Sequence, residues 1–258
     1  MIKAFADTRH MTMRHVMALW RQPWWIAVTL VQPMIWLLLY GALFKRVVEI
    51  PGFHGGSYIG FLAPGVVMMT AVFSAGWGGM SMIEDLDRGV IDRFLVSPVR
   101  RSALITGRVL QSALSIAIQA LIIVGLALLV GADLGGGAGG LAALVVVAAL
   151  LGTGFGALSN GLALVMRREE SLIAVMQFLL LPLTFVSSAF MQADLAPGWI
   201  RDAAGFNPVN WAVEAGREAV SSGADWGLVA ERAALLAVFA AVCAAFATRA
   251  FRRYQRAV

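Results

Sequence analysis

The strongest constraint on this chain is a series of long stretches that contain no Asp, Glu, Lys or Arg. The hydrocarbon core of a bilayer is about 30 Å thick, and a helix needs ~20 predominantly apolar residues to cross it. Each stretch is long enough to do so, and five membrane spans are therefore predicted. The uncharged stretches are residues 24–44, 55–83, 109–132, 134–166 and 171–193.

A sixth apolar stretch, residues 233–248, is shorter than the others. At about 1.5 Å per residue it crosses the core only if Glu231 and Arg232 extend toward the interface. Composition agrees with a membrane protein, because 60% of the residues are hydrophobic and only 14% are charged. We therefore predict an all-α membrane protein. Its six spans are placed at about 24–44, 57–83, 109–131, 141–166, 171–191 and 227–248.

Basic residues are unevenly distributed among the segments that connect these spans. Most lie before the first span, in the second and fourth loops, and in the tail after residue 248. The positive-inside rule places such segments in the cytoplasm. Both termini are thus expected in the cytoplasm, which requires an even number of spans and supports the sixth. The net charge of +5 has the same explanation and does not indicate a nucleic-acid partner.

Two segments outside the spans have helical patterns of their own. Residues 2–21 mix apolar residues with arginines, as in a helix that lies in the membrane surface, and predict an interfacial elbow helix. In the outer segment 192–225, Asn207 followed by Pro208 indicates a helix start. A re-entrant element is expected there, with a solvent-facing amphipathic helix as the alternative. Its candidate residues are Asn207, Pro208, Trp211 and Glu214.

The loop between the second and third spans predicts a short amphipathic helix over residues 85–96. Leu86, Val90 and Phe94 fall at helical spacing, and Glu84 can pair with Arg88 four residues later. An apolar face in the cytoplasm needs a cover, and a partner protein would supply one. The alternative is a solvated loop whose charges anchor the neighbouring spans.

Three segments resemble one known family when they are taken in order. Two of them are FLAPGVV from Phe61 and NPVNWAVEAGREAV from Asn207. The third begins with an acidic residue and a basic residue followed by glycine, continues to a proline, and ends with a leucine and a glycine-basic pair. Its residues are Glu84, Arg88, Gly89, Arg93, Pro98, Leu104, Gly107 and Arg108. On these segments the sequence resembles the ABC-2 type permeases, the transmembrane subunits of ATP-binding-cassette exporters. The likeness covers nearly the whole chain and is greatest to the drug-export branch.

The resemblance implies one transmembrane domain over residues 1–258, with a coupling helix at 85–96 and re-entrant helices before the sixth span. It also implies two paired permease subunits and two ATPase subunits bound from the cytoplasm. Expected contacts to the ATPase are Glu84, Arg88, Gly89, Arg93, Phe94 and Pro98. The second and fifth spans would line the substrate path, with Met69, Phe73, Trp77, Phe178, Thr184 and Phe185.

The chain lacks the residues for chemistry of its own. A P-loop requires glycines followed by Lys-Ser or Lys-Thr, and the only lysines, Lys3 and Lys45, do not fit that pattern. No enzyme activity, catalytic residue or cofactor is therefore expected in this chain. A metal site is not expected either, because His10 and His15 do not have the spacing of metal ligands. ATP and Mg²⁺ would be bound by the separate ATPase subunit.

Other classes of membrane protein fit the sequence less well. An ion-coupled transporter needs ionisable groups at membrane depth, and the interiors of the predicted spans hold only neutral polar residues. An intramembrane hydrolase could use Ser159 or Ser187, but no histidine lies in a span to act as the base. A purely structural membrane subunit stays open.

The expected cargo is a lipophilic drug, antibiotic or lipid, because methionine and aromatic side chains adapt to many apolar shapes. Export of a polysaccharide or glycolipid is the alternative. The expected location is the cytoplasmic, inner membrane of a bacterium.

Overall fold

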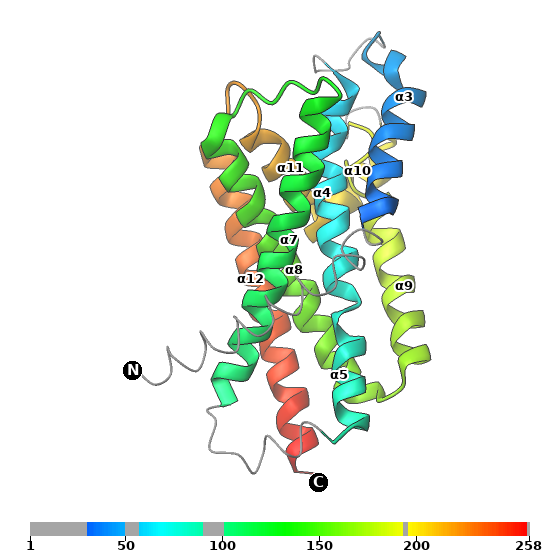
Figure 1. The fold of residues 1–258 in the computed structure, drawn as a ribbon, viewed down its shortest axis with the longest axis vertical. Helices are drawn as coiled ribbons and strands as arrows, with labels where there is room; N and C mark the ends of the chain where they lie inside the picture. The colour runs from blue at the N-terminus through cyan, green and yellow to red at the C-terminus, as the bar shows by residue number, and fades with distance from the viewer. Residues whose placement is uncertain (1–29, 50–56, 90–100, 193–195, 257–258) are drawn as a thin grey trace.

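The computed structural model describes residues 30–49, 57–89, 101–192 and 196–256, with the backbone alone for 101–110. Within these ranges every regular element is a helix, and the long helices run nearly parallel in one bundle (Figure 1). The elements are η1 (Trp36–Tyr40), α3 (Gly41–Leu43), η2 (Lys45–Glu49), α4 (Tyr58–Gly76), α5 (Gly78–Asp87), α7 (Arg101–Leu129), α8 (Gly137–Met166), α9 (Glu169–Phe185), α10 (Gly198–Gly205), α11 (Pro208–Ala219) and α12 (Trp226–Gln255).

Four helical segments in the described part of the chain are long and apolar enough to cross a membrane. They are Tyr58–Asp87, Gln111–Leu129, Gly137–Met166 and Trp226–Gln255. The first of them combines α4 and α5, which meet at Trp77. These segments agree with the predicted second, third, fourth and sixth spans.

The predicted first span is described only from Leu30 onward, and the predicted fifth span corresponds to a shorter helix. An apolar helix covers Leu30–Leu43, and the predicted elbow at 2–21 lies outside the described residues. The fifth span was predicted to end at 191, but α9 ends at Phe185. Pro182 removes one helical hydrogen-bond donor near this end, and the chain then continues as turns.

The predicted sixth span lies within α12, which runs from Trp226 to Gln255. The helix begins at Asp225, whose side chain accepts hydrogen bonds from the backbone amides of Gly227 and Leu228. It continues past Arg249, since arginine is a good helix former. The helix is long and apolar enough to cross a bilayer.

Small residues set the packing of α8 against its neighbours. A Cβ atom at Gly154 would lie 2.6 Å from the Phe239 ring, and one at Gly161 would lie 2.6 Å from the Phe246 ring. Both aromatic rings belong to α12, so the glycines let α12 approach α8 closely. Helix α4 lies between α8 and the helices α3 and α9 (Figure 1), and most of its residues are buried.

Candidate functional site

The last turn of α9 and the irregular backbone after it are held by side chains of α11 and of its cap residue, Asn207. The Asn207 side-chain amide donates to the Leu183 carbonyl at 2.6 Å, and the Asn210 side-chain oxygen accepts from the Ser188 amide at 2.9 Å. Ser188 is buried. Irregular backbone can lie at membrane depth only where protein groups satisfy its hydrogen bonds. The polar residues of α11 therefore make the early end of α9 possible.

Arg217 of α11 stabilises the same segment. One guanidinium nitrogen donates to the Ser188 carbonyl at 2.8 Å, and the guanidinium carbon lies 3.6 Å from the centre of the Phe61 ring. Although Arg217 as a residue keeps some exposure, its charged group is enclosed by these neighbours. Burial lowers the pKa of Arg217 to about 9, opposed by the nearby Glu214 carboxylate. The guanidinium therefore stays protonated at neutral pH.

Glu214 connects α11 to the last helix. Its Oε1 atom accepts from the Asn210 amide at 2.8 Å, and its Oε2 atom lies 2.9 Å from Arg232 Nε of α12, an ion pair that lacks hydrogen-bond geometry. Both side chains of the ion pair are about three-quarters buried. We name the group Asn207, Asn210, Glu214, Arg217 and Arg232 the outer polar cluster. It ties the end of α9, helix α11 and α12 together.

The predictions for this region identified only part of the cluster. Asn207 caps α11 by accepting from the Val209 amide, and Pro208 occupies its first position, as expected. Trp211 instead donates to the Gly205 carbonyl at 2.7 Å on the exposed side. Sequence reasoning missed Asn210, Arg217 and Arg232. The signal was present, since positions 207, 210, 214 and 217 repeat at helical spacing and form one polar stripe.

The residues predicted to line a substrate path fall in different environments. Phe178 and Phe185 on α9 are 84% and 62% exposed. Thr184 is 1% exposed, and its hydroxyl group donates to the Leu180 carbonyl at 2.8 Å. Within this chain Thr184 is therefore directed into the bundle, away from the surface that the two phenylalanines form.

The candidates on the second span are partly buried. Met69, Phe73 and Trp77 all pack against the core. Trp77 occupies the junction between α4 and α5. Met69, Phe73 and Trp77 therefore keep part of their surface accessible.

Ser159 of α8 holds the junction at Trp77. Because the Met80 amide donates to the Trp77 carbonyl, the Gly76 carbonyl lacks its usual helical donor. The Ser159 hydroxyl donates to that Gly76 carbonyl and accepts from the Gly79 amide. Ser159 is fully buried, so its hydroxyl group has a structural role and is not an exposed nucleophile.

The predicted coupling residues are described only at their amino-terminal end. Glu84 and Arg88 approach within 3.8 Å, as their spacing predicts, but both are exposed, where an ion pair contributes little. Residues 85–87 form the last turn of α5. Gly89 has a φ of +63°, a conformation that glycine adopts readily and that ends the helix.

The rest of the predicted coupling helix, including Arg93, Phe94 and Pro98, lies outside the described residues, and its existence stays a prediction. Beside the end of α5 lies a small cavity of about 180 Å³, lined by Ile83, Leu86, Asp87, Arg167 and Tyr254. The Arg167 guanidinium lies 5.0 Å above the Tyr254 ring. The ends of α5, α8 and α12 therefore meet at the same end of the bundle (Figure 1).

The described residues contain no group of three or more His, Cys, Asp or Glu side chains that could hold a metal ion. Cys243 is buried as a free thiol in α12. The charged residues of the outer polar cluster are engaged with each other and with backbone groups. Nothing in this geometry resembles a nucleophile with its base.

Comparison with known proteins gives the family. The model of the family described as ABC-2 type transporter matches residues 6–220. The chain belongs to the ABC-2 type transporter family. It is similar to the daunorubicin resistance ABC transporter permease protein DrrB1 of Streptomyces coeruleorubidus, with 29% identity over 94% of this chain and 83% of that protein.

Two further relatives carry the name "Putative transport permease ycf38". The protein of Porphyra purpurea is 29% identical over 83% of this chain and 73% of its own length. The protein of Cyanophora paradoxa is 30% identical over 75% of this chain and 67% of its own length. As an ABC-2 permease, the chain is a multi-pass transmembrane subunit and not the ATPase, and its transporter requires a partner ATP-binding subunit.

Proposed function

We propose that this ABC-2 permease exports a lipophilic compound, such as a drug, an antibiotic or a lipid, from the cytoplasm. The observation that carries the proposal is the similarity to the daunorubicin resistance permease over 94% of the chain. The energy would come from ATP, bound with Mg²⁺ and hydrolysed by the separate ATP-binding subunit. Export of a polysaccharide or glycolipid is the competing outcome of the test below.

The proposed assembly has two copies of this permease and two ATPase subunits in a bacterial inner membrane. Each permease would have six spans, with both termini in the cytoplasm. Support comes from the distribution of charge, because Arg88, Arg167, Arg168 and the arginines at the end of α12 all belong to the same end of the bundle. The outer polar cluster would then lie toward the opposite face of the membrane.

The exposed face of α9 supports a lipophilic cargo. Phe178, Leu181 and Phe185 recur at helical spacing and are exposed on this helix. Exposed apolar surface of this kind is covered by lipid, by a second subunit, or by a bound apolar molecule. In the proposed dimer this face would border the path, with Met69, Phe73 and Trp77 behind it on the second span.

Coupling would begin at the segment 85–96. Closure of the ATPase subunits on ATP would move this segment, and α5 would carry the movement to the junction at Trp77. The paired bundles would then change from an inward-open to an outward-open arrangement. The ATPase contacts proposed from the sequence, Glu84, Arg88, Gly89, Arg93, Phe94 and Pro98, are retained in this scheme.

The test is transport in inverted membrane vesicles that contain the permease together with its ATP-binding partner. Fluorescence of daunorubicin or another lipophilic dye is followed after ATP is added. ATP-dependent accumulation is expected, and it should disappear when the P-loop lysine of the ATPase is replaced. Accumulation of an oligosaccharide-lipid but of no lipophilic dye would refute the proposed cargo, and pumping without the ATPase would refute the mechanism.

A further inference from the structure

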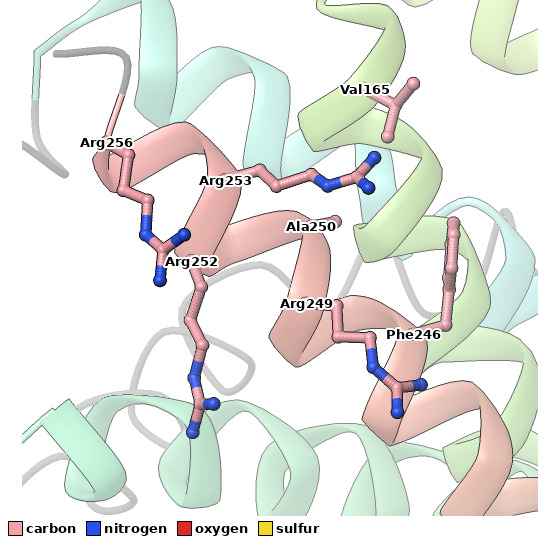
Figure 2. A pocket seen from close by; sticks show the side chains of 7 residues that line it. All are labelled: Val165, Phe246, Arg249, Ala250, Arg252, Arg253 and Arg256. Atoms are coloured by element: carbon pink, nitrogen blue, oxygen red, sulfur yellow. The ribbon is translucent and has the colours of Figure 1, made fainter.

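A groove lies at the carboxyl-terminal end of α12, against α8. Its volume is about 390 Å³. Figure 2 shows Arg249 and Arg253 extending along the side of α8, near Phe246 and Val165, while Arg252 and Arg256 extend on the other side. The groove is lined by Val165, Phe246, Arg249, Ala250, Arg252, Arg253 and Arg256.

The floor of this groove is apolar. It is formed by Phe246 and the buried Ala250 of α12 together with Val165 of α8. Phe246 can lie close to α8 because Gly161 has no side chain there. A charged molecule that enters the groove therefore meets apolar surface on one side.

An apolar stripe extends from the groove along the outside of the bundle. Val238 and Val242 lie two turns and one turn before Phe246 on α12, and they are 62% and 63% exposed. Residues spaced by four share one helical face. The groove is therefore the charged end of a lipid-facing apolar stripe.

The described residues of the chain do not neutralise the positive charge of the groove. None of its four arginines has an ion-pair partner among the described residues, and the residues that line it include no acidic side chain. The positive-inside rule accounts for arginines at this end of a span. It does not require four of them around one groove with an apolar floor.

We propose that this groove binds the headgroup of an anionic phospholipid from the cytoplasmic leaflet. Guanidinium groups match phosphate oxygens in a bidentate arrangement, and basic pockets between helices on the cytoplasmic side suit such headgroups. One acyl chain would follow Phe246, Val242 and Val238. The assignment relies on the cytoplasmic location of the end of α12 given above, but not on the identity of the cargo.

The experiment uses the permease purified with its ATP-binding partner in detergent. Phosphatidylglycerol or phosphatidylcholine is added, and lipids retained by the complex are counted by native mass spectrometry. The groove variant carries Arg249→Gln and Arg253→Gln. The matched control carries Arg168→Gln and Arg201→Gln, which remove the same charge at exposed positions outside the groove.

Retention of phosphatidylglycerol by the groove variant should fall about 25-fold, since each basic residue near an anionic surface contributes about fivefold. The control variant should retain it like the wild type, and inorganic phosphate should not displace it. Phosphatidylcholine retention should not change in any variant. A variant with Arg249→Lys and Arg253→Lys keeps the charge and should retain most of the lipid.

Unchanged retention in the groove variant would overturn the proposal, as would an equal loss in the control. Displacement by inorganic phosphate would also overturn it, because the site would then recognise a free anion. Binding only when the ATP-binding partner is removed would also overturn it, because the partner and not a lipid would then cover the groove. If the double variant does not fold, Arg253→Gln alone carries the same test with a fivefold effect. Since lipid retention is the measurement, failure of drug export would leave this result unaffected.

Discussion

Replacing Arg217 with methionine should destabilise the outer half of this permease. The substitution keeps a long flexible side chain but removes the charge and all donors. Arg217 donates to the Ser188 carbonyl at 2.8 Å and covers the Phe61 ring at 3.6 Å. The Ser188 carbonyl follows the end of α9, where no helical amide is available to replace the lost donor.

The expected loss follows from these two contacts. A hydrogen bond from a charged donor contributes about 1.5–3 kcal/mol, and a desolvated cation–π contact contributes about 2 kcal/mol. Part of this sum is offset, because the variant no longer has to enclose a charge. We therefore expect a net loss of about 3 kcal/mol for Arg217→Met. Arg217→Lys keeps the charge but not the planar fork, and it should lose about half as much.

The measurement is reversible unfolding of the purified permease by SDS in mixed micelles, followed by tryptophan fluorescence. Arg201→Met is the matched control, since Arg201 is exposed on the neighbouring helix α10, and it should change stability by less than about 0.5 kcal/mol. Hydrogen exchange of the Ser188 amide should also accelerate in Arg217→Met. If Arg217→Met and Arg201→Met unfold at the same SDS concentration, the role assigned to Arg217 is refuted.

Three further predictions concern other parts of the chain. Gly140→Ala should lower the free energy of unfolding in SDS by about 2–4 kcal/mol, because its Cβ would collide with the Ala219 carbonyl. Gly139→Ala in the same helix is the control, since a Cβ there meets nothing within 4 Å. Equal stability of the two variants would contradict this packing. Phe178→Ser should change the free energy of unfolding in SDS by less than about 1 kcal/mol, yet it should lower dye transport severalfold. Unchanged transport would show that Phe178 does not line the proposed path. Phe94→Ala and Arg88→Ala should each reduce transport without loss of the permease itself, and full transport in both would contradict the coupling role.

The positions of the spans were largely predictable because the bilayer imposes a local rule on the sequence. Uncharged stretches of sufficient length correspond to α4 with α5, to α7 and to α8. The end of the fifth span was not predictable in this way. Residues 186–191 are as apolar as the helix before them, and α9 ends at Phe185 where Asn207, Asn210 and Arg217 from α11 satisfy the following backbone.

The candidate site was predicted in part for a similar reason. Residue type identified Phe178 and Thr184 as path candidates, but only the packing of α9 shows that the first is exposed and the second is buried. The polar stripe of α11 could have been found from its spacing. Its partner Arg232 could not, because its pairing with Glu214 depends on how α12 packs against α11.

The junction at Trp77 bears on how related permeases can diverge. Ser159 fits there only because position 79 carries no side chain, since a Cβ at Gly79 would meet the Ser159 carbonyl at 2.6 Å. Loss of the hydroxyl would leave a carbonyl and an amide without partners where water cannot replace them. We expect Gly79 and Ser159 to be inherited as a pair, so that descendants with a larger residue at position 79 also replace the serine.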